Sequence, residues 1–100
     1  MVVGTCRLEL RIPEAASLKD KRQILRSIKD RVQNRFNVSI AEVGYLEEWQ
    51  RATLAVACVS NEGRVVDEML NKVVNYVEGH GQALLVDYSI DMMVHGDGFA

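Results

Sequence analysis

Hydrophobic and polar residues alternate along the first segment of the chain, residues 2–12. One face consists of apolar residues and a glycine: Val2, Gly4, Cys6, Leu8, Leu10 and Ile12. The other face is polar: Thr5, Arg7, Glu9 and Arg11. A period of two residues is typical of a β-strand with one buried face. Pro13 is expected to end this strand.

A helical period follows the first strand. Ser17 has a side chain suited to a helix N-cap, and Asp20 fits a variant of the capping box. One apolar stripe with helical spacing follows: Leu18, Ile24, Leu25, Ile28, Val32 and Phe36. Ser60 or Asn61 is expected to cap a second helix with its own stripe: Val66, Met69, Leu70, Val73, Val74 and Val77.

Three more strands are expected, over residues 37–44, 51–59 and 83–94. The first two are expected to form a hairpin, because the turn at 44–50 is too short for a crossover helix. Gly79 and Gly81 should end the second helix. In the last strand the hydrophobic residues are expected to face inward: Leu84, Val86, Tyr88, Ile90 and Met92. The polar residues between them are expected to face outward: Asp87, Ser89 and Asp91.

Together these elements predict an α+β fold, a ferredoxin-like βαββαβ sandwich. The four-stranded antiparallel sheet is expected in the order 4-1-3-2, with two helices on one face because each helix has a single apolar stripe. We expect residues 1–94 to form a single domain and residues 95–100 to be a flexible tail.

Targeting signals and cysteine chemistry point to a cytoplasmic protein. The N-terminal segment lacks the pattern of a signal peptide, and no apolar run approaches the ~20 residues that span a bilayer. No membrane partner is therefore expected. Cys6 and Cys58 fall within strand patterns and are expected to be buried and reduced, with a disulfide or a metal pair as the alternative.

Charge is distributed unevenly along the chain. The formal net charge is −2, but the segment from Ser17 to Phe36 carries +5 and the remainder −7. Its seven basic residues are Lys19, Lys21, Arg22, Arg26, Lys29, Arg31 and Arg35. This asymmetry predicts a local basic surface on an acidic body.

The predicted topology brings four segments to one end of the sheet, where the first helix and the third strand begin. We expect basic residues and a tryptophan to converge there and continue along the helix, forming a nucleic-acid-binding surface: Arg11, Lys19, Lys21, Arg22, Arg26, Lys29, Trp49 and Arg51. The helix N-terminus adds free N–H groups, which suit phosphate, including an RNA backbone. The alternative is a solvated surface, with Glu14, Glu47 and Glu48 nearby.

Four motifs resemble the YlxP-like family, a bacterial domain of unknown function. They are Ser17–Arg22, Arg35–Glu42, Trp49–Ala52 and Val86–Tyr88, in that order along the chain. The resemblance covers about residues 1–94 and implies a ferredoxin-like domain without established catalytic activity. The family's genes often lie beside those of translation initiation and ribosome maturation factors, which implies a link to the ribosome.

Catalytic and metal-binding motifs are lacking in the sequence. It has no phosphate-binding glycine loop, no zinc spacing, and no nucleophile with a histidine at a predictable position. His80 and His95 are expected at opposite ends of the sheet, so no metal site is expected. We predict that the protein is not an enzyme and uses no small-molecule cofactor.

The leading hypothesis is a domain that binds structured RNA or a ribosomal particle through the basic helix. The central strands should display no aromatic platform for bases, so binding would use backbone charge and shape. The outward row of Ala55, Ala57 and Val59 favours a second hypothesis, a protein-interaction module or homodimer that uses the open sheet face. A third is a regulatory domain for a small ligand.

Overall fold

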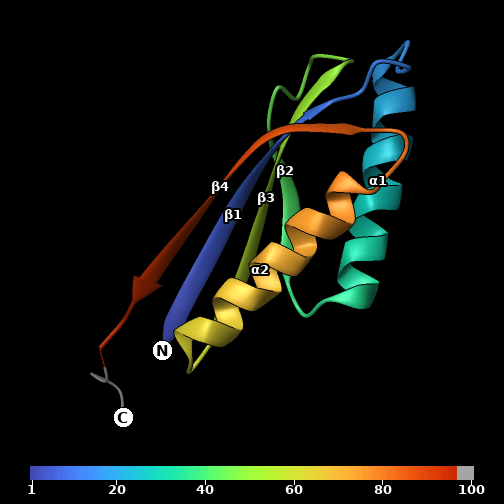
Figure 1. The fold of residues 1–100 in the computed structure, drawn as a ribbon. Coiled ribbons are helices and arrows are strands. Elements are labelled where there is room, and N and C mark those ends of the chain that lie inside the picture. The colour runs from blue at the N-terminus through green and yellow to red at the C-terminus, as the bar shows by residue number, and fades with distance from the viewer. Residues whose placement is uncertain (97–100) are drawn as a thin grey trace.

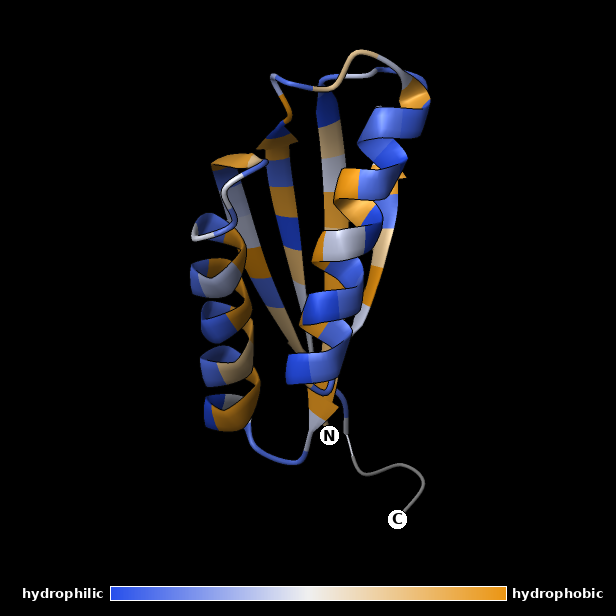
Figure 2. Cartoon of the chain, turned by 90° about the vertical axis from the view of Figure 1, so that its right-hand side faces the viewer, coloured by the Kyte–Doolittle hydropathy of each residue, from blue (hydrophilic) through white to orange (hydrophobic). Residues whose placement is uncertain are grey.

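The elements follow the predicted βαββαβ order. The computed structural model describes residues 1–96 as β1 (Val2–Arg11), α1 (Leu18–Arg35), β2 (Ser39–Gly44), β3 (Arg51–Ser60), α2 (Gly63–Glu78) and β4 (Leu84–Val94). The strands form one antiparallel sheet in the order β2-β3-β1-β4 (Figure 1). Both helices cover the same face (Figure 2). The predicted ferredoxin-like topology, including the β2–β3 hairpin, is confirmed.

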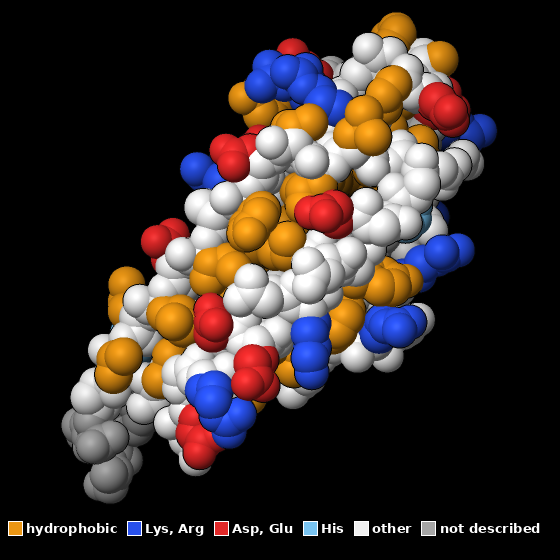
Figure 3. Space-filling view, viewed as in Figure 1, with side chains coloured by type: hydrophobic (Ala, Val, Ile, Leu, Met, Phe, Trp, Pro, Cys, Tyr) orange, Lys and Arg blue, Asp and Glu red, His pale blue; other side chains and the backbone are white. Residues whose placement is uncertain are grey.

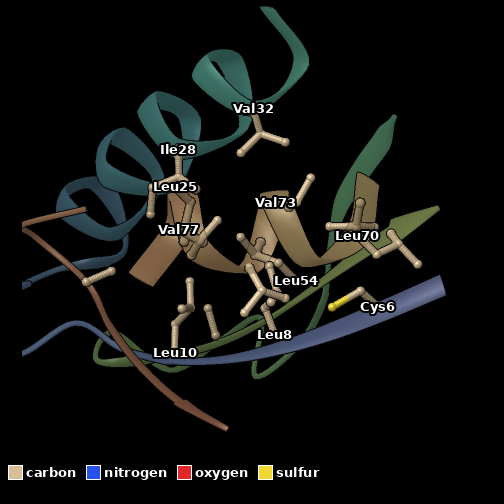
Figure 4. Close-up of a cluster of buried hydrophobic side chains, with 14 of the residues drawn as sticks. Cys6, Leu8, Leu10, Leu25, Ile28, Val32, Leu54, Leu70, Val73 and Val77 are labelled. Carbon is tan, nitrogen blue, oxygen red and sulfur yellow. The ribbon is translucent and has the colours of Figure 1, made fainter. Parts of the chain in front are cut away.

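The hydrophobic core lies between the sheet and the two helices. The inward residues of β1 are all buried, as the alternation predicts. Leu8 is opposite Leu54 of β3, and both side chains are fully buried. Ile28 of α1 and Val73 of α2 close the core from the other side (Figure 4).

Gly4 allows α2 to pack closely on β1. A Cβ atom at this position would collide with the side chains of Val66 and Leu70. Both of these α2 residues are buried. The glycine therefore fixes how near the helix lies to the central strand, since packed interiors have little room for added atoms.

The two helices begin differently. The Ser17 Oγ atom accepts a hydrogen bond from the Asp20 N–H at 3.1 Å, which confirms the predicted N-cap of α1. The prediction that Ser60 or Asn61 caps α2 is wrong, because the N-cap is Glu62 and its side chain makes no capping bond. The Ser60 hydroxyl instead accepts from the Glu62 N–H at 3.2 Å, in the turn before the helix.

A bulge in β4 reverses the predicted orientation of its first residues. Leu85 pairs with Leu10, and Asp87 pairs with Glu9, so Val86 is an extra residue between them. The prediction that Leu84 and Val86 face inward is therefore wrong. Both side chains are 56% exposed, whereas Leu85 packs against the core.

The ladder between β1 and β4 continues to the first residue of the chain. The His95 N–H donates to the Met1 carbonyl at 2.9 Å, and the Met1 amino group donates to the His95 carbonyl at 3.3 Å. The predicted flexible tail spans 95–100, and residues 97–100 of it lie outside the described part of the chain. No helix within residues 1–96 is long and apolar enough to cross a membrane.

Both cysteines are buried free thiols, as predicted. Cys6 is 1% exposed and Cys58 is 9% exposed. Cys58 lies opposite Gly4, two residues from Cys6 on the neighbouring strand. Burial raises the pKa of both thiols, that of Cys6 to about 11.

Candidate nucleic-acid interface

Four basic side chains follow one flank of α1. Lys19, Arg22, Arg26 and Lys29 are spaced by three, four and three residues, which places them side by side along a helix. Lys29 is half-buried and the other three are exposed. The row extends over ~15 Å of helix axis. We call it the α1 basic row; the hydrophilic outer surface of α1 is visible in Figure 2.

The α1 basic row is not neutralised by ion pairs within residues 1–96. Within residues 1–96, none of its four side chains forms an ion pair with a carboxylate. Arg64 of α2 is the contrast, since its guanidinium lies 3.7 Å from Glu62 and 3.2 Å from Glu68. The positive charge of the row is therefore available to a partner.

The other basic residues of α1 lie on the flank beside α2. The Arg35 guanidinium sits 5.1 Å from the centroid of the Tyr76 ring. Burial, together with the charge of Arg31, lowers the pKa of His80 just after α2. Arg31 and Arg35 thus belong to the surface around the α1–α2 contact and not to the α1 basic row.

Lys21 does not lie on the basic surface, contrary to the sequence prediction. It is 1% exposed, and its Nζ atom lies 2.8 Å from the Glu42 carboxylate. The same ammonium group donates to the carbonyls of Tyr45 at 2.6 Å and Glu48 at 2.7 Å. The burial of Lys21 could have been predicted from the sequence. It precedes Ile24 and Leu25 by three and four residues, which places it within the buried stripe of the helix.

The predicted meeting of distant segments at one end of the sheet is confirmed. Lys21 ties the first turn of α1 to the β2–β3 loop. The Gln50 side-chain amide donates to the carbonyls of Pro13 at 3.1 Å and Ala15 at 3.2 Å, which ties the same loop to the segment before α1. The Ile12 N–H also donates to the Gln50 carbonyl at 2.9 Å.

The side chains at this end separate into two groups. Arg11 and Arg51 are opposite each other on β1 and β3 and belong to the face of the sheet that the helices leave open. Trp49 is 52% exposed and lines a hollow of about 600 Å³ with them and with Glu47 and Glu48. The α1 basic row is on the helix-covered side, so the eight predicted residues do not form one surface.

Comparisons with known proteins assign a family. Residues 3–90 match the family described as protein of unknown function, DUF503. The uncharacterized protein YlxP of Bacillus subtilis (strain 168) is 40% identical over 77 residues, which cover 77% of this chain and 84% of that protein.

A solved structure of a transposase, "Structure of the REP associates tyrosine transposase bound to a REP hairpin", also aligns with this chain. The alignment covers 95% of this chain and 58% of the transposase chain, at a TM-score of 0.45 and 11% identity. The family match covers most of the chain, and it agrees with the motifs in α1, β2, β3 and β4. The chain belongs to the DUF503 family of proteins of unknown function, the YlxP-like family.

Proposed function

We propose that the protein is a non-catalytic domain that binds structured RNA, alone or in a ribosomal particle, through the α1 basic row. The observation that carries this proposal is the row itself, four cations on one helix flank without acidic partners in residues 1–96. Lysine and arginine bind phosphate oxygens through charge-assisted hydrogen bonds. Release of counterions from the nucleic acid adds a sequence-independent driving force.

The open face of the sheet favours structured RNA over unpaired bases as the ligand. Outward side chains of the central strands β1 and β3 include Thr5, Arg7, Ala55 and Ala57, and none of the outward residues on these two strands is aromatic. Single-stranded RNA is usually bound by aromatic side chains that stack on bases, whereas a duplex is bound by backbone and shape. A basic helix flank suits the second mode.

The proposal that the domain is non-catalytic rests on the sequence. Neither of its histidines is placed beside a nucleophile, and no motif for phosphate or metal chemistry is present. The structure puts His80 after α2 and His95 beside Met1, at opposite ends of β4.

Affinity purification from cells tests the proposal. The wild type and a variant with Lys19, Arg22 and Arg26 changed to glutamine would be purified at low and at high salt, and the co-purified RNA sequenced. We expect the wild type to retain ribosomal RNA or another structured RNA at low salt, and to lose it at high salt. The variant should lose it at both. Equal RNA recovery with both proteins would contradict the proposal.

A second candidate function, homodimerisation, is favoured by the exposed edge strand β4. It is 11 residues long and has no lysine, arginine or proline, whereas the other edge, β2, has six residues and a bulge. Hydrophobic side chains are exposed along it (Figure 3): Leu84, Val86, Tyr88, Met92, Met93 and Val94. An unprotected edge of this kind readily pairs with another strand.

Of the registers centred at residues 89, 90 and 91, the aspartates of β4 permit one for two antiparallel copies related by a two-fold axis. An axis at Ser89 would set Asp87 opposite Asp91 of the second copy, and an axis at Asp91 would set that residue opposite itself. Both arrangements oppose like charges across strands, which is destabilising. With Ile90 on the axis, Asp87 faces Met93 and Asp91 faces Ser89. We propose this register for the dimer.

A further inference from the structure

A hollow on the open face of the sheet has features of an anion site. It measures about 400 Å³ and lies where β1 ends beside β3 and β4. Its charged and aromatic lining residues include Arg7, Glu9, Arg11, Tyr45, Arg51 and Asp87. We call it the open-face hollow.

Two arginines in the open-face hollow lie directly opposite each other. Arg11 and Arg51 are direct partners in the register of β1 and β3. Within residues 1–96, neither forms an ion pair with a carboxylate. Like charges at facing positions destabilise a sheet. A bound anion between the two guanidinium groups would remove that repulsion and accept several hydrogen bonds.

Arg51 is held in position before any ligand arrives. Its guanidinium donates to the Tyr45 hydroxyl at 2.8 Å and lies 4.0 Å from the centroid of the same ring. Tyr45 has a φ of 58°, a left-handed conformation that a bulky residue rarely adopts. The buried Lys21 fixes this turn, because its ammonium donates to the Tyr45 carbonyl at 2.6 Å. Such preorganisation lowers the entropic cost of binding a ligand.

A pair of carboxylates borders the arginines and limits the shape of the ligand. Glu9 lies opposite Asp87 in the register of β1 and β4, two residues from Arg11. The Glu9 carboxylate accepts a hydrogen bond from the Thr53 hydroxyl at 2.8 Å. These acids repel a second phosphate group, but they accept hydrogen bonds from hydroxyl groups. The lining therefore suits one phosphate joined to a hydroxyl-bearing body.

We propose that the open-face hollow binds a terminal phosphate, a phosphomonoester on a ribose-like body. Arg11 and Arg51 would hold the phosphate, while Asp87 and Glu9 would accept from the hydroxyl groups. A free 5′-nucleotide and the 5′ end of an RNA share this chemistry. The site is independent of the α1 basic row, because its arginines face the side of the sheet opposite to α1.

Calorimetric titration with four probes tests this site. The probes are AMP and adenosine, and one short RNA with either a 5′-phosphate or a 5′-hydroxyl. We expect at least one phosphorylated probe to bind roughly tenfold or more tightly than its phosphate-free partner, the usual strength of hydrogen bonds to charged groups. Binding of AMP alone identifies a free nucleotide as the ligand, and binding of the RNA alone identifies the RNA end.

Variants locate the phosphate on the protein. Arg11→Gln and Arg51→Gln should each weaken the phosphate-dependent binding about tenfold. Arg64→Gln, an exposed arginine on α2, should leave it unchanged. The Lys19, Arg22 and Arg26 glutamine variant should also leave the phosphate preference intact, which separates this test from that of the proposed function. Thermal unfolding checks that each variant is folded.

Two results would overturn the inference. One is equal binding of the phosphorylated and phosphate-free probes, or no binding of any probe up to about 5 mM, which is weaker than the millimolar range of a weak specific site. The other is an unchanged phosphate preference in both the Arg11 and the Arg51 variants.

Discussion

Lys21 is a buried cation, although the segment of the sequence around it is basic and mostly exposed. Burial of an ammonium group is costly unless its charge and all three donors are satisfied. Here the carboxylate of Glu42 and two backbone carbonyls of the β2–β3 loop meet this requirement. Within residues 1–96, Glu42 Oε2 is buried, and the Lys21 ammonium 2.8 Å away is the group that balances its charge.

Removal of the Lys21 charge is expected to destabilise the fold strongly. Lys21→Met keeps most of the side-chain volume but leaves the Glu42 carboxylate, which is only 18% exposed, without its partner. We expect the free energy of unfolding, measured with urea, to fall by about 3 kcal/mol. The double variant with Glu42→Leu should recover part of this loss, because it removes the unpaired charge. A loss as small as that of an exposed lysine would contradict the role of Lys21.

The buried thiol of Cys6 predicts a dependence of stability on pH. Burial raises its pKa from 9.0 to about 11. Below pH 9 the thiol is protonated in both states, so its contribution to stability is complete. Between pH 9 and 11 the unfolded chain releases the proton first, and stability therefore falls as the pH rises. In urea unfolding, Cys6→Ala should show a shallower decline over this range; identical slopes would show that Cys6 is not responsible.

At the scale of elements, the sequence predicts best those segments that bury one continuous face. The alternation of β1 and the stripe of α1 correspond to real burial, and both predictions are confirmed. The last strand was less predictable, because β4 is an edge with exposed hydrophobic residues on both sides. Nothing in its sequence indicates that the extra residue of the bulge falls at Val86.

The edge of β4 predicts a dimer that one charge would disrupt. Wild type should have about twice the 11.2 kDa mass of the chain in light scattering at tens of micromolar, roughly where a weak dimer forms. Met92→Lys should shift it to monomer, because a lysine in the paired edge would be desolvated. Val43→Lys on the opposite edge is the control and should stay dimeric. A monomeric wild type would argue against the dimer.

At the scale of the whole molecule, topology predicted which segments meet but not which side chains share a surface. The start of α1, the start of β3 and the β2–β3 loop do converge. However, α1 covers one face of the sheet, while the alternation of β1 places Arg11 on the other. Lys21 is on neither surface, because it is buried against Glu42 and the β2–β3 loop. The sequence thus indicated one basic cluster, whereas the fold separates the basic side chains into two groups on different faces of the sheet.

The two proposals assign this molecule two sites for phosphate groups, with different roles. The α1 basic row offers charges at helical spacing for the backbone of a folded RNA. The open-face hollow offers two arginines bordered by acids, which suits a single terminal group. An RNA that engaged both would have to pass around the end of the sheet that carries Trp49.

The salt dependence of affinity for ribosomal subunits or a structured RNA tests the central claim most directly. Fluorescence anisotropy would compare wild type with the Lys19, Arg22 and Arg26 glutamine variant. A matched control changes Arg31, Arg64 and Lys72, which alters net charge equally. We predict weaker binding by the first variant, with a slope of log affinity against log salt that is shallower by about two to three units. An equal loss in the control, or no salt-dependent binding by the wild type, would contradict the account.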